Sequence, residues 1–173
     1  MLQLSISDWQ KRINKQFNFN LYQEIIIDNI KNTQEITNFE YVVLPIIEDK
    51  LVSVDNKEEY IERDFIICRS MYVCSKYFLG DLIGDLNTRR ASFVNNYDSS
   101  DNHCISYFHH YIRDNKYCIN VYARSMNYST NFVFDNQTFI LAYNEVFNLI
   151  KRKYEFVDLG FIKVFVFSLH KYI

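Results

Sequence analysis

The segment Ile105-Ser-Tyr-Phe-His-His-Tyr-Ile-Arg-Asp-Asn-Lys-Tyr-Cys-Ile-Asn-Val-Tyr-Ala123 decides the fold of this chain, because it is typical of two strands joined by a tight turn. Successive side chains of a strand point to opposite faces of a sheet. One face would carry Ile105, Tyr107, His109 and Tyr111, and the other Ser106, Phe108, His110 and Ile112. Asp114-Asn115 supply the reversing turn. We therefore predict a β-hairpin.

Reactive residues flank this hairpin on both sides. Cys104 directly precedes it, and Arg124-Ser125 directly follow it, twenty positions after the cysteine. A thiolate is a nucleophile, and a guanidinium group binds phosphate in a forked geometry. A thiol near a phosphate-binding arginine is the combination expected of an enzyme that acts on a nucleotide.

A helix and a strand are predicted after the hairpin. Beyond the polar stretch 126–131, apolar residues recur at helical spacing, namely Phe139, Tyr143, Val146, Phe147 and Ile150. Asp135 or Asn136 are candidate N-caps, and the basic residues at 151–153 suit the C-terminal end of the helix dipole. A last strand is predicted over residues 161–170.

The first half of the chain predicts a series of shorter elements. The predicted helices are one from a Ser7-Asp8 cap to about Phe17, a second over 21–31 and a third over 76–86. The second would bury Ile25, Ile26 and Ile30, and the third Leu79, Leu82, Ile83 and Leu86. Strands are predicted over 41–47 and 64–73, and a surface turn at 56–59.

Composition excludes several classes of protein. A length of 173 residues with 49% hydrophobic and 23% charged residues predicts a single folded domain, 1–173. Only three glycines argue against a Gly-rich phosphate loop, and a net charge of −2 argues against nucleic acid as a partner. No signal-like core and no long apolar run occur, so we expect a soluble cytoplasmic protein without membrane contact.

The four cysteines and the neighbouring histidines predict reduced thiols and no metal site. The cysteines form no CxxC pair. His109 and His110 would point to opposite faces of a strand, which separates them as ligands.

Five motifs in the same order resemble the catalytic half of thymidylate synthase and its relative deoxycytidylate hydroxymethylase. They are Thr88-Arg-Arg-Ala-Ser-Phe-Val94 for a Ser-Arg-Arg strand, Cys104 for the nucleophile, Tyr122-Ala-Arg-Ser125 for a Tyr-Gln-Arg-Ser segment, Val133-Phe-Asp135 for Pro-Phe-Asn, and His170-Lys-Tyr172 for His-x-Tyr. The resemblance implies an α/β (α+β) fold of the thymidylate synthase type, a mixed β-sheet with flanking helices that dimerises through its sheet.

The resemblance also implies the substrate and the role of each site residue. The substrate would be a pyrimidine nucleoside 5′-monophosphate whose C6 is attacked by Cys104, which makes C5 nucleophilic toward a one-carbon unit. The implied phosphate ligands are Arg124 and Ser125, with Arg89 and Arg90 from the other subunit of a homodimer. His170 and Tyr172 would bind the sugar, and Asn127 would join the substrate site. Methylenetetrahydrofolate would be the one-carbon donor.

Asp135 shifts the expected base from uracil to cytosine. The family's usual Asn matches a uracil edge, whereas a carboxyl group can accept from the exocyclic amine of cytosine and, when protonated, donate to N3. The resemblance therefore favours a cytidylate hydroxymethylase, a methyl- or hydroxymethyltransferase of nucleotide metabolism.

The chain departs from the family pattern at several positions. The residue after the nucleophile is Ile105 rather than His, the one before it is His103 rather than Pro, and Asn127 replaces an Asp. An Arg-Thr-Gly phosphate loop is absent, and Glu58, Glu59 and Glu62 are the candidates for the general base. The C-terminal segment that closes over folate in the family is also missing from the sequence.

Other interpretations of the same residues stay open. Cys104 also fits a small buried residue, Asp135 a helix cap, and Arg89-Arg90 a solvated pair. The chain could then be a catalytically degenerate nucleotide-binding or regulatory protein, or an interaction protein that retains only the dimerising sheet.

Overall fold

The computed structural model describes residues 3–18, 23–27, 31–45, 82, 84–88, 91–94 and 104–172. Its elements are β1 (Gln3–Leu4), α1 (Ile6–Asn18), β2 (Gln23–Ile27), β3 (Lys31–Val43), β4 (Ser92–Val94), β5 (Ile105–Arg113), β6 (Lys116–Asn127), α3 (Phe132–Lys153) and β7 (Asp158–Tyr172). The predicted elements at 56–59 and 64–73, and most of the one at 76–86, lie outside these residues.

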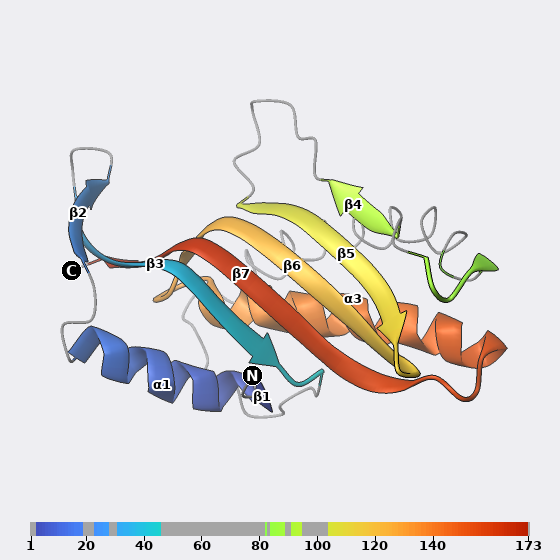
Figure 1. The fold of residues 1–173 in the computed structure, drawn as a ribbon. Helices are drawn as coiled ribbons and strands as arrows, with labels where there is room; N and C mark the ends of the chain where they lie inside the picture. Colours follow the sequence, from blue (N-terminus) through green and yellow to red (C-terminus); the bar gives the residue numbers. More distant parts are fainter. Residues whose placement is uncertain are drawn as a thin grey trace.

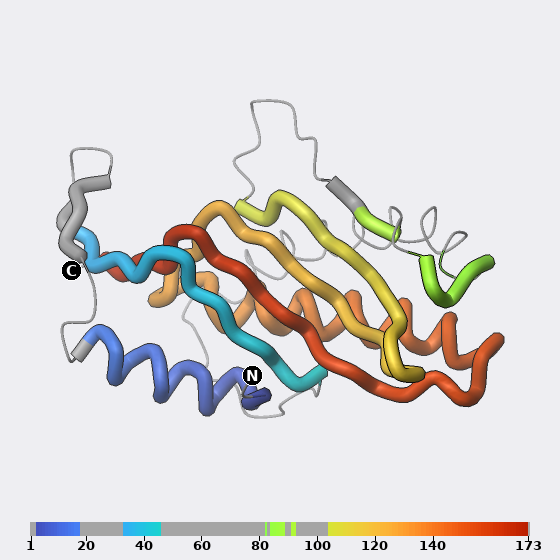
Figure 2. Tube along the Cα trace, viewed as in Figure 1, coloured from blue at the N-terminus to red at the C-terminus, as the bar shows by residue number. Residues whose placement is uncertain are grey.

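The described strands form one mixed sheet of seven strands in the order β1-β3-β7-β6-β5-β4, with β2 paired to β3 (Figure 1). β6 and β7 run parallel, and the other neighbours of these two strands are antiparallel. Figure 2 shows β3, β7, β6 and β5 side by side, with the C-terminus next to the start of β3. The chain is therefore a mixed α/β protein, as its sequence predicts.

The hairpin of β5 and β6 is confirmed, and so is its turn. Asp114 and Asn115 have φ values of 51° and 58°, the left-handed conformation that the favoured two-residue hairpin turns require. The alternation of faces holds from Tyr107 onward. It fails before that point, because a register shift between Ile105 and Tyr107 buries Ile105 and exposes the serine that follows it.

Helix α3 connects the parallel strands β6 and β7 and packs on one face of the sheet. Tyr143 fixes it there: its hydroxyl donates to the carbonyl oxygen of Tyr117 in β6 at 2.5 Å and accepts from the amide of Gly160 in β7 at 2.8 Å. The predicted helical spacing is confirmed, because Phe139, Tyr143, Val146 and Ile150 are all buried. The cap prediction is wrong. Helix α3 begins at Phe132 after Asn131, so Asp135 lies within its first turn.

Helix α1 packs against the same face as α3. The Trp9 ring lies 5.6 Å from Tyr41 of β3, and Tyr41 lies 5.5 Å from Phe132 of α3. The predicted first helix is confirmed with an earlier cap, because Ser5 Oγ accepts from the amide of Asp8 at 3.2 Å and donates to its carboxylate at 3.0 Å. These aromatic contacts join both helices and β3 in a common core.

The predicted helix over 21–31 is wrong, because residues 23–27 form strand β2. They pair with β3 in antiparallel register from Gln23↔Glu35 to Ile27↔Lys31. Three consecutive isoleucines favour a strand, since β-branched side chains pack well on a pleated surface. Of the strand predicted at 41–47, residues 41–43 are the C-terminal end of β3, Leu44 and Pro45 lie beyond the strand, and 46–47 lie outside the described residues. The final strand extends to 158–172.

The residue pairing of β7 with both of its neighbours, β3 and β6, is interrupted at the same point along β7. The pairing of β3 with β7 passes over Asn38, which has a positive φ of 52°, and the pairing of β6 with β7 passes over Arg124. The buried positions of β6 on either side, Ala123 and Met126, are three residues apart rather than two. Such breaks re-aim side chains, and here they leave Arg124 and Ser125 outside the core. Met126 belongs to the core rather than to a polar loop.

Within the described ranges, no helix combines the length and apolarity needed to cross a membrane.

Candidate functional site

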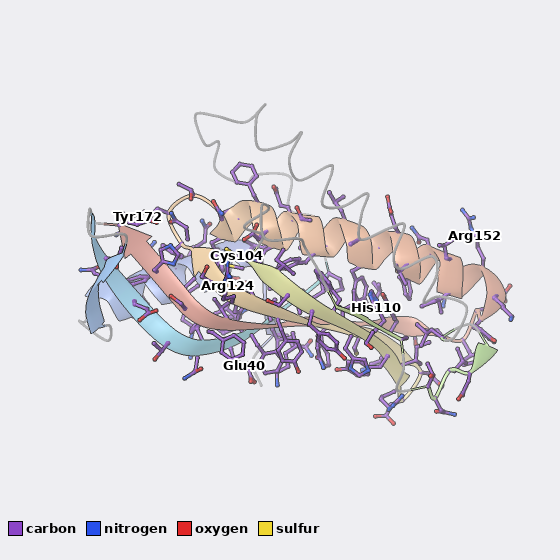
Figure 3. All side chains as sticks on the ribbon, turned by 90° about the horizontal axis from the view of Figure 1, so that it is seen from above. Glu40, Cys104, His110, Arg124, Arg152 and Tyr172 are labelled. Atoms are coloured by element: carbon purple, nitrogen blue, oxygen red, sulfur yellow. The ribbon has the colours of Figure 1, made fainter. Side chains whose placement is uncertain are left out.

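The predicted nucleophile and two of the predicted phosphate ligands, Arg124 and Ser125, lie together at one end of the hairpin. The hydroxyl of Ser125 donates to Sγ of Cys104 at 3.0 Å, and the backbone amide of Arg124 donates to the carbonyl oxygen of Cys104 at 2.6 Å. Cys104 and Ser125 are half-buried, whereas Arg124 is exposed. Figure 3 shows Cys104 and Arg124 next to each other, far from His110 on the same sheet. The site therefore offers a partly accessible thiol beside an exposed guanidinium group.

Asp135 lies in the first turn of α3, and its charge acts on Tyr41 of β3. The Tyr41 hydroxyl contacts Sδ of Met126 in β6 at 3.7 Å and the side-chain oxygen of Asn136 at 3.1 Å. Burial raises the pKa of Tyr41, and the Asp135 carboxylate raises it further against the hydrogen bond from Asn136. Asp135 is half-buried, and Met126 adjoins Ser125. These contacts tie the start of α3 to the buried face of β6 at Met126.

The predicted sugar ligands lie where β6 and β7 end. His170 pairs in register with Asn127 of β6, and its carbonyl oxygen accepts from the amide of Tyr128 at 2.8 Å. The His170 ring meets the Tyr172 ring edge to face at 5.4 Å. Asn127 also closes the turn after β6, because its side-chain oxygen accepts from the amide of Ser129 at 2.9 Å. These residues therefore share one end of the sheet with Ser125.

Several predicted site residues lie outside the described residues. They are the phosphate ligands Arg89 and Arg90, the departure His103, and the candidate bases Glu58, Glu59 and Glu62. Their roles stay predictions.

Glu35 is a polar residue of this region that sequence reasoning missed. It pairs in register with His170 and is only 8% exposed. The surrounding sequence, Lys31-Asn-Thr-Gln-Glu35, is polar and gives no signal of a buried carboxylate. Only the pairing of β3 with β7 brings it beside His170.

A second polar cluster lies in the core, away from Cys104. Nδ1 of His110 and the hydroxyl of Tyr117 are 2.7 Å apart, and both side chains are buried. Burial lowers the pKa of His110 to about 4, which makes the imidazole neutral at physiological pH. The part of the chain that the structure describes contains no group of three or more His, Cys, Asp or Glu residues placed to hold a metal ion.

Comparison of the chain with protein-family models and with curated proteins found no match.

Proposed function

We propose that this chain is a cytoplasmic enzyme that binds a pyrimidine nucleoside 5′-monophosphate and transfers a one-carbon unit to C5 of its base. The contact between Ser125 and Cys104 is the observation that carries the proposal. Residues that the motifs assign to phosphate binding and to nucleophilic attack are in contact, although they belong to different segments of the chain. Arg124 completes the group as an exposed cation.

The chemistry begins with addition of the Cys104 thiolate to C6 of the pyrimidine ring. A carbon–sulfur bond forms, and the electron pair of the C5–C6 double bond moves to C5 and is delocalised into the ring. C5 then attacks a one-carbon electrophile. Loss of the C5 proton expels the carrier of the one-carbon unit and leaves an exocyclic methylene group at C5, while the sulfur of Cys104 stays bound to C6. Water adds to this methylene group and gives up a proton, and expulsion of the thiolate then restores the C5–C6 double bond, regenerates Cys104 and gives a hydroxymethyl product.

Methylenetetrahydrofolate would supply the one-carbon unit in this reaction, as the resemblance implies. Within the described ranges we assign no residue to folate.

The position of Asp135 supports cytidylate as the substrate. Its carboxyl group is half-buried in the first turn of α3, and its charge acts on Tyr41, which contacts Met126 of β6. A partly desolvated carboxyl group discriminates strongly between bases, because a mismatched edge leaves polar groups unpaired.

Aromatic residues on the sheet face opposite α1 and α3 support a homodimer. Tyr122 lies between Tyr107 at 5.4 Å and Phe165 at 4.6 Å, and Phe167 is 57% exposed. Figure 3 shows α3 on one side of the sheet and Glu40 on the other. We propose that this face pairs with a second copy of the chain. Arg89 and Arg90 would then reach the phosphate site of the partner.

Hydrogen exchange at C5 tests the covalent step without a one-carbon donor. Reversible addition of Cys104 to C6 lets the C5 proton of cytidylate exchange with deuterium oxide, which NMR detects as loss of the H5 signal. We expect exchange with the wild type and none with Cys104→Ala. The buried Cys118 provides a matched control, since Cys118→Ala should leave exchange unchanged.

A thermal shift screen of nucleoside monophosphates separates the alternatives, because ligands of the native state raise its apparent stability. Stabilisation by cytidylate without C5 exchange would indicate a nucleotide-binding protein that lacks catalysis. No stabilisation by any pyrimidine nucleotide would contradict the proposal and favour an interaction protein built on the aromatic sheet face.

A further inference from the structure

Three polar side chains form a row across the end of the sheet beyond Ser125. Glu35 of β3 pairs in register with His170 of β7, and His170 pairs with Asn127 of β6. Directly paired residues of neighbouring strands project their side chains to the same side of the sheet, about 5 Å apart. Glu35, His170 and Asn127 are therefore neighbours.

Two members of this row are ionisable and buried. Glu35 and His170 are each 8% exposed. Among the described residues, none provides a hydrogen-bond partner for Nδ1 of His170. Buried polar atoms are nearly always hydrogen-bonded, because burial without a partner forfeits the hydrogen bonds that water would make. An unsatisfied imidazole nitrogen at this place is suited to a polar group of a ligand.

The charge of Glu35 acts on this imidazole. Burial lowers the pKa of His170, whereas a hydrogen bond between its ring and the Ser168 backbone and, to a smaller extent, the charge of the Glu35 carboxylate raise it. A carboxylate beside a histidine commonly fixes the tautomer and the orientation of the ring. Glu35 is placed to do this for His170, because the two residues face each other across β3 and β7.

The row lies within reach of a nucleotide held at the phosphate site. Asn127 stands two residues beyond Ser125 on β6, which is about 7 Å along a strand. A sugar phosphate can bridge that separation. A sugar hydroxyl can both donate and accept a hydrogen bond, so it can satisfy Nδ1 in either tautomer.

We propose that Glu35 is a positioning residue that holds the His170 imidazole in the orientation in which Nδ1 meets a hydroxyl group of the bound sugar. This inference rests on the proposed function. It adds to the site a residue that belongs to none of the sequence motifs.

The test compares the affinities of 2′-deoxycytidine 5′-monophosphate and its 2′,3′-dideoxy analogue by calorimetry. We expect the wild type to bind the hydroxylated nucleotide about tenfold more tightly, the effect of one buried hydrogen bond. Glu35→Gln should bring this ratio close to one. Glu40→Gln is the matched control, because Glu40 lies on the same strand but pairs with Lys163 at 2.8 Å. It should leave the ratio unchanged.

NMR titration of His170 provides a readout that needs no nucleotide. Removing the carboxylate should lower the pKa of His170 in Glu35→Gln, and Glu40→Gln should leave it unchanged. If Glu35→Gln does not fold, Glu35→Asp retains the charge but withdraws it by one methylene group, and it should reduce the hydroxyl preference in part.

The outcomes separate this inference from the proposed function. A wild type that binds no pyrimidine nucleotide overturns the proposed function. A wild type that binds nucleotides, with a hydroxyl preference or a His170 titration unaffected by Glu35→Gln, overturns the role of Glu35 alone.

Discussion

The hydroxyl of Ser125 donates a hydrogen bond to the sulfur of Cys104 at 3.0 Å, across the open end of the β5–β6 hairpin. The register shift near Ile105 and the irregular pairing at Arg124 both occur at this end. A hydrogen bond from a hydroxyl stabilises a thiolate more than a thiol, because the anion is the stronger acceptor. The contact therefore places Ser125 in a position to support the nucleophile as well as to bind phosphate.

Ser125→Ala should slow the alkylation of Cys104 by iodoacetamide. Loss of one hydrogen bond is worth about 0.5–1.5 kcal/mol, which corresponds to a decrease of about twofold to tenfold in rate. Rates are measured by mass spectrometry of the modified peptide. Ser106→Ala, which removes an exposed hydroxyl of β5, is the control and should keep the wild-type rate. Equal rates in all three proteins would show that Ser125 does not assist the thiolate.

Asp135→Asn should change the choice of base. We expect the wild type to bind cytidylate more tightly than uridylate, and the variant to lose or reverse this preference, a change of about 1–3 kcal/mol. Calorimetric titration with both nucleotides measures the effect. Glu145→Gln removes an exposed carboxylate from the same helix and should preserve the preference. If Asp135→Asn lowers stability while base preference stays the same, Asp135 serves only the helix.

Phe167→Asp should convert the proposed dimer to monomers. The substitution puts a charge on the aromatic sheet face at a side chain that is 57% exposed. Burying an unpaired charge in an interface is unfavourable. Leu141→Asp changes an apolar residue of α3 that is 49% exposed, and it should leave the dimer intact. Analytical ultracentrifugation gives the molecular mass, and a monomeric wild type would contradict the dimer.

His110 should make the folded state less stable as the pH falls below neutrality. Its pKa is about 4 in the folded protein, against an ordinary value of 6.5. Between these values the unfolded chain binds a proton and the folded protein does not. The contribution of the neutral His110 to the free energy of unfolding is therefore complete above pH 6.5. It is lost as the pH falls toward 4, which lowers the free energy of unfolding by about 3 kcal/mol. Urea unfolding at several pH values should show a smaller decrease for His110→Gln. An equal decrease would exclude His110 as its source.

Gly160→Ala should destabilise the protein by about 1–3 kcal/mol, as overpacking of a core usually does. An added Cβ would overlap the carbonyl oxygen of Tyr117 and the sulfur of Cys118. That carbonyl is part of β6 and accepts a hydrogen bond from Tyr143, so it cannot move freely. A Cβ at the exposed Gly84 would meet no atom of the described residues within 4 Å, so Gly84→Ala is the control and should be neutral or stabilising. Thermal unfolding measures both, and similar melting temperatures would contradict the prediction.

The sequence by itself determined the elements whose signals are local. The Asp114-Asn115 turn, the helical spacing of Phe139 to Ile150 and the strand at 161–170 depend on neighbours within a few residues, and the sequence pattern predicts each of them. Residues 23–27 were predicted as a helix, because a short run of isoleucines fits either element. The antiparallel pairing with β3 makes residues 23–27 a strand.

Only the tertiary structure decided which distant residues meet. The contact of Ser125 with Cys104 requires the hairpin register, and the row of Glu35, His170 and Asn127 requires both neighbours of β7. Strand pairing joins segments far apart in the chain through backbone hydrogen bonds that every residue can form. The amino-acid types therefore leave the register open, and the packing of α1 and α3 on one face of the sheet selects it.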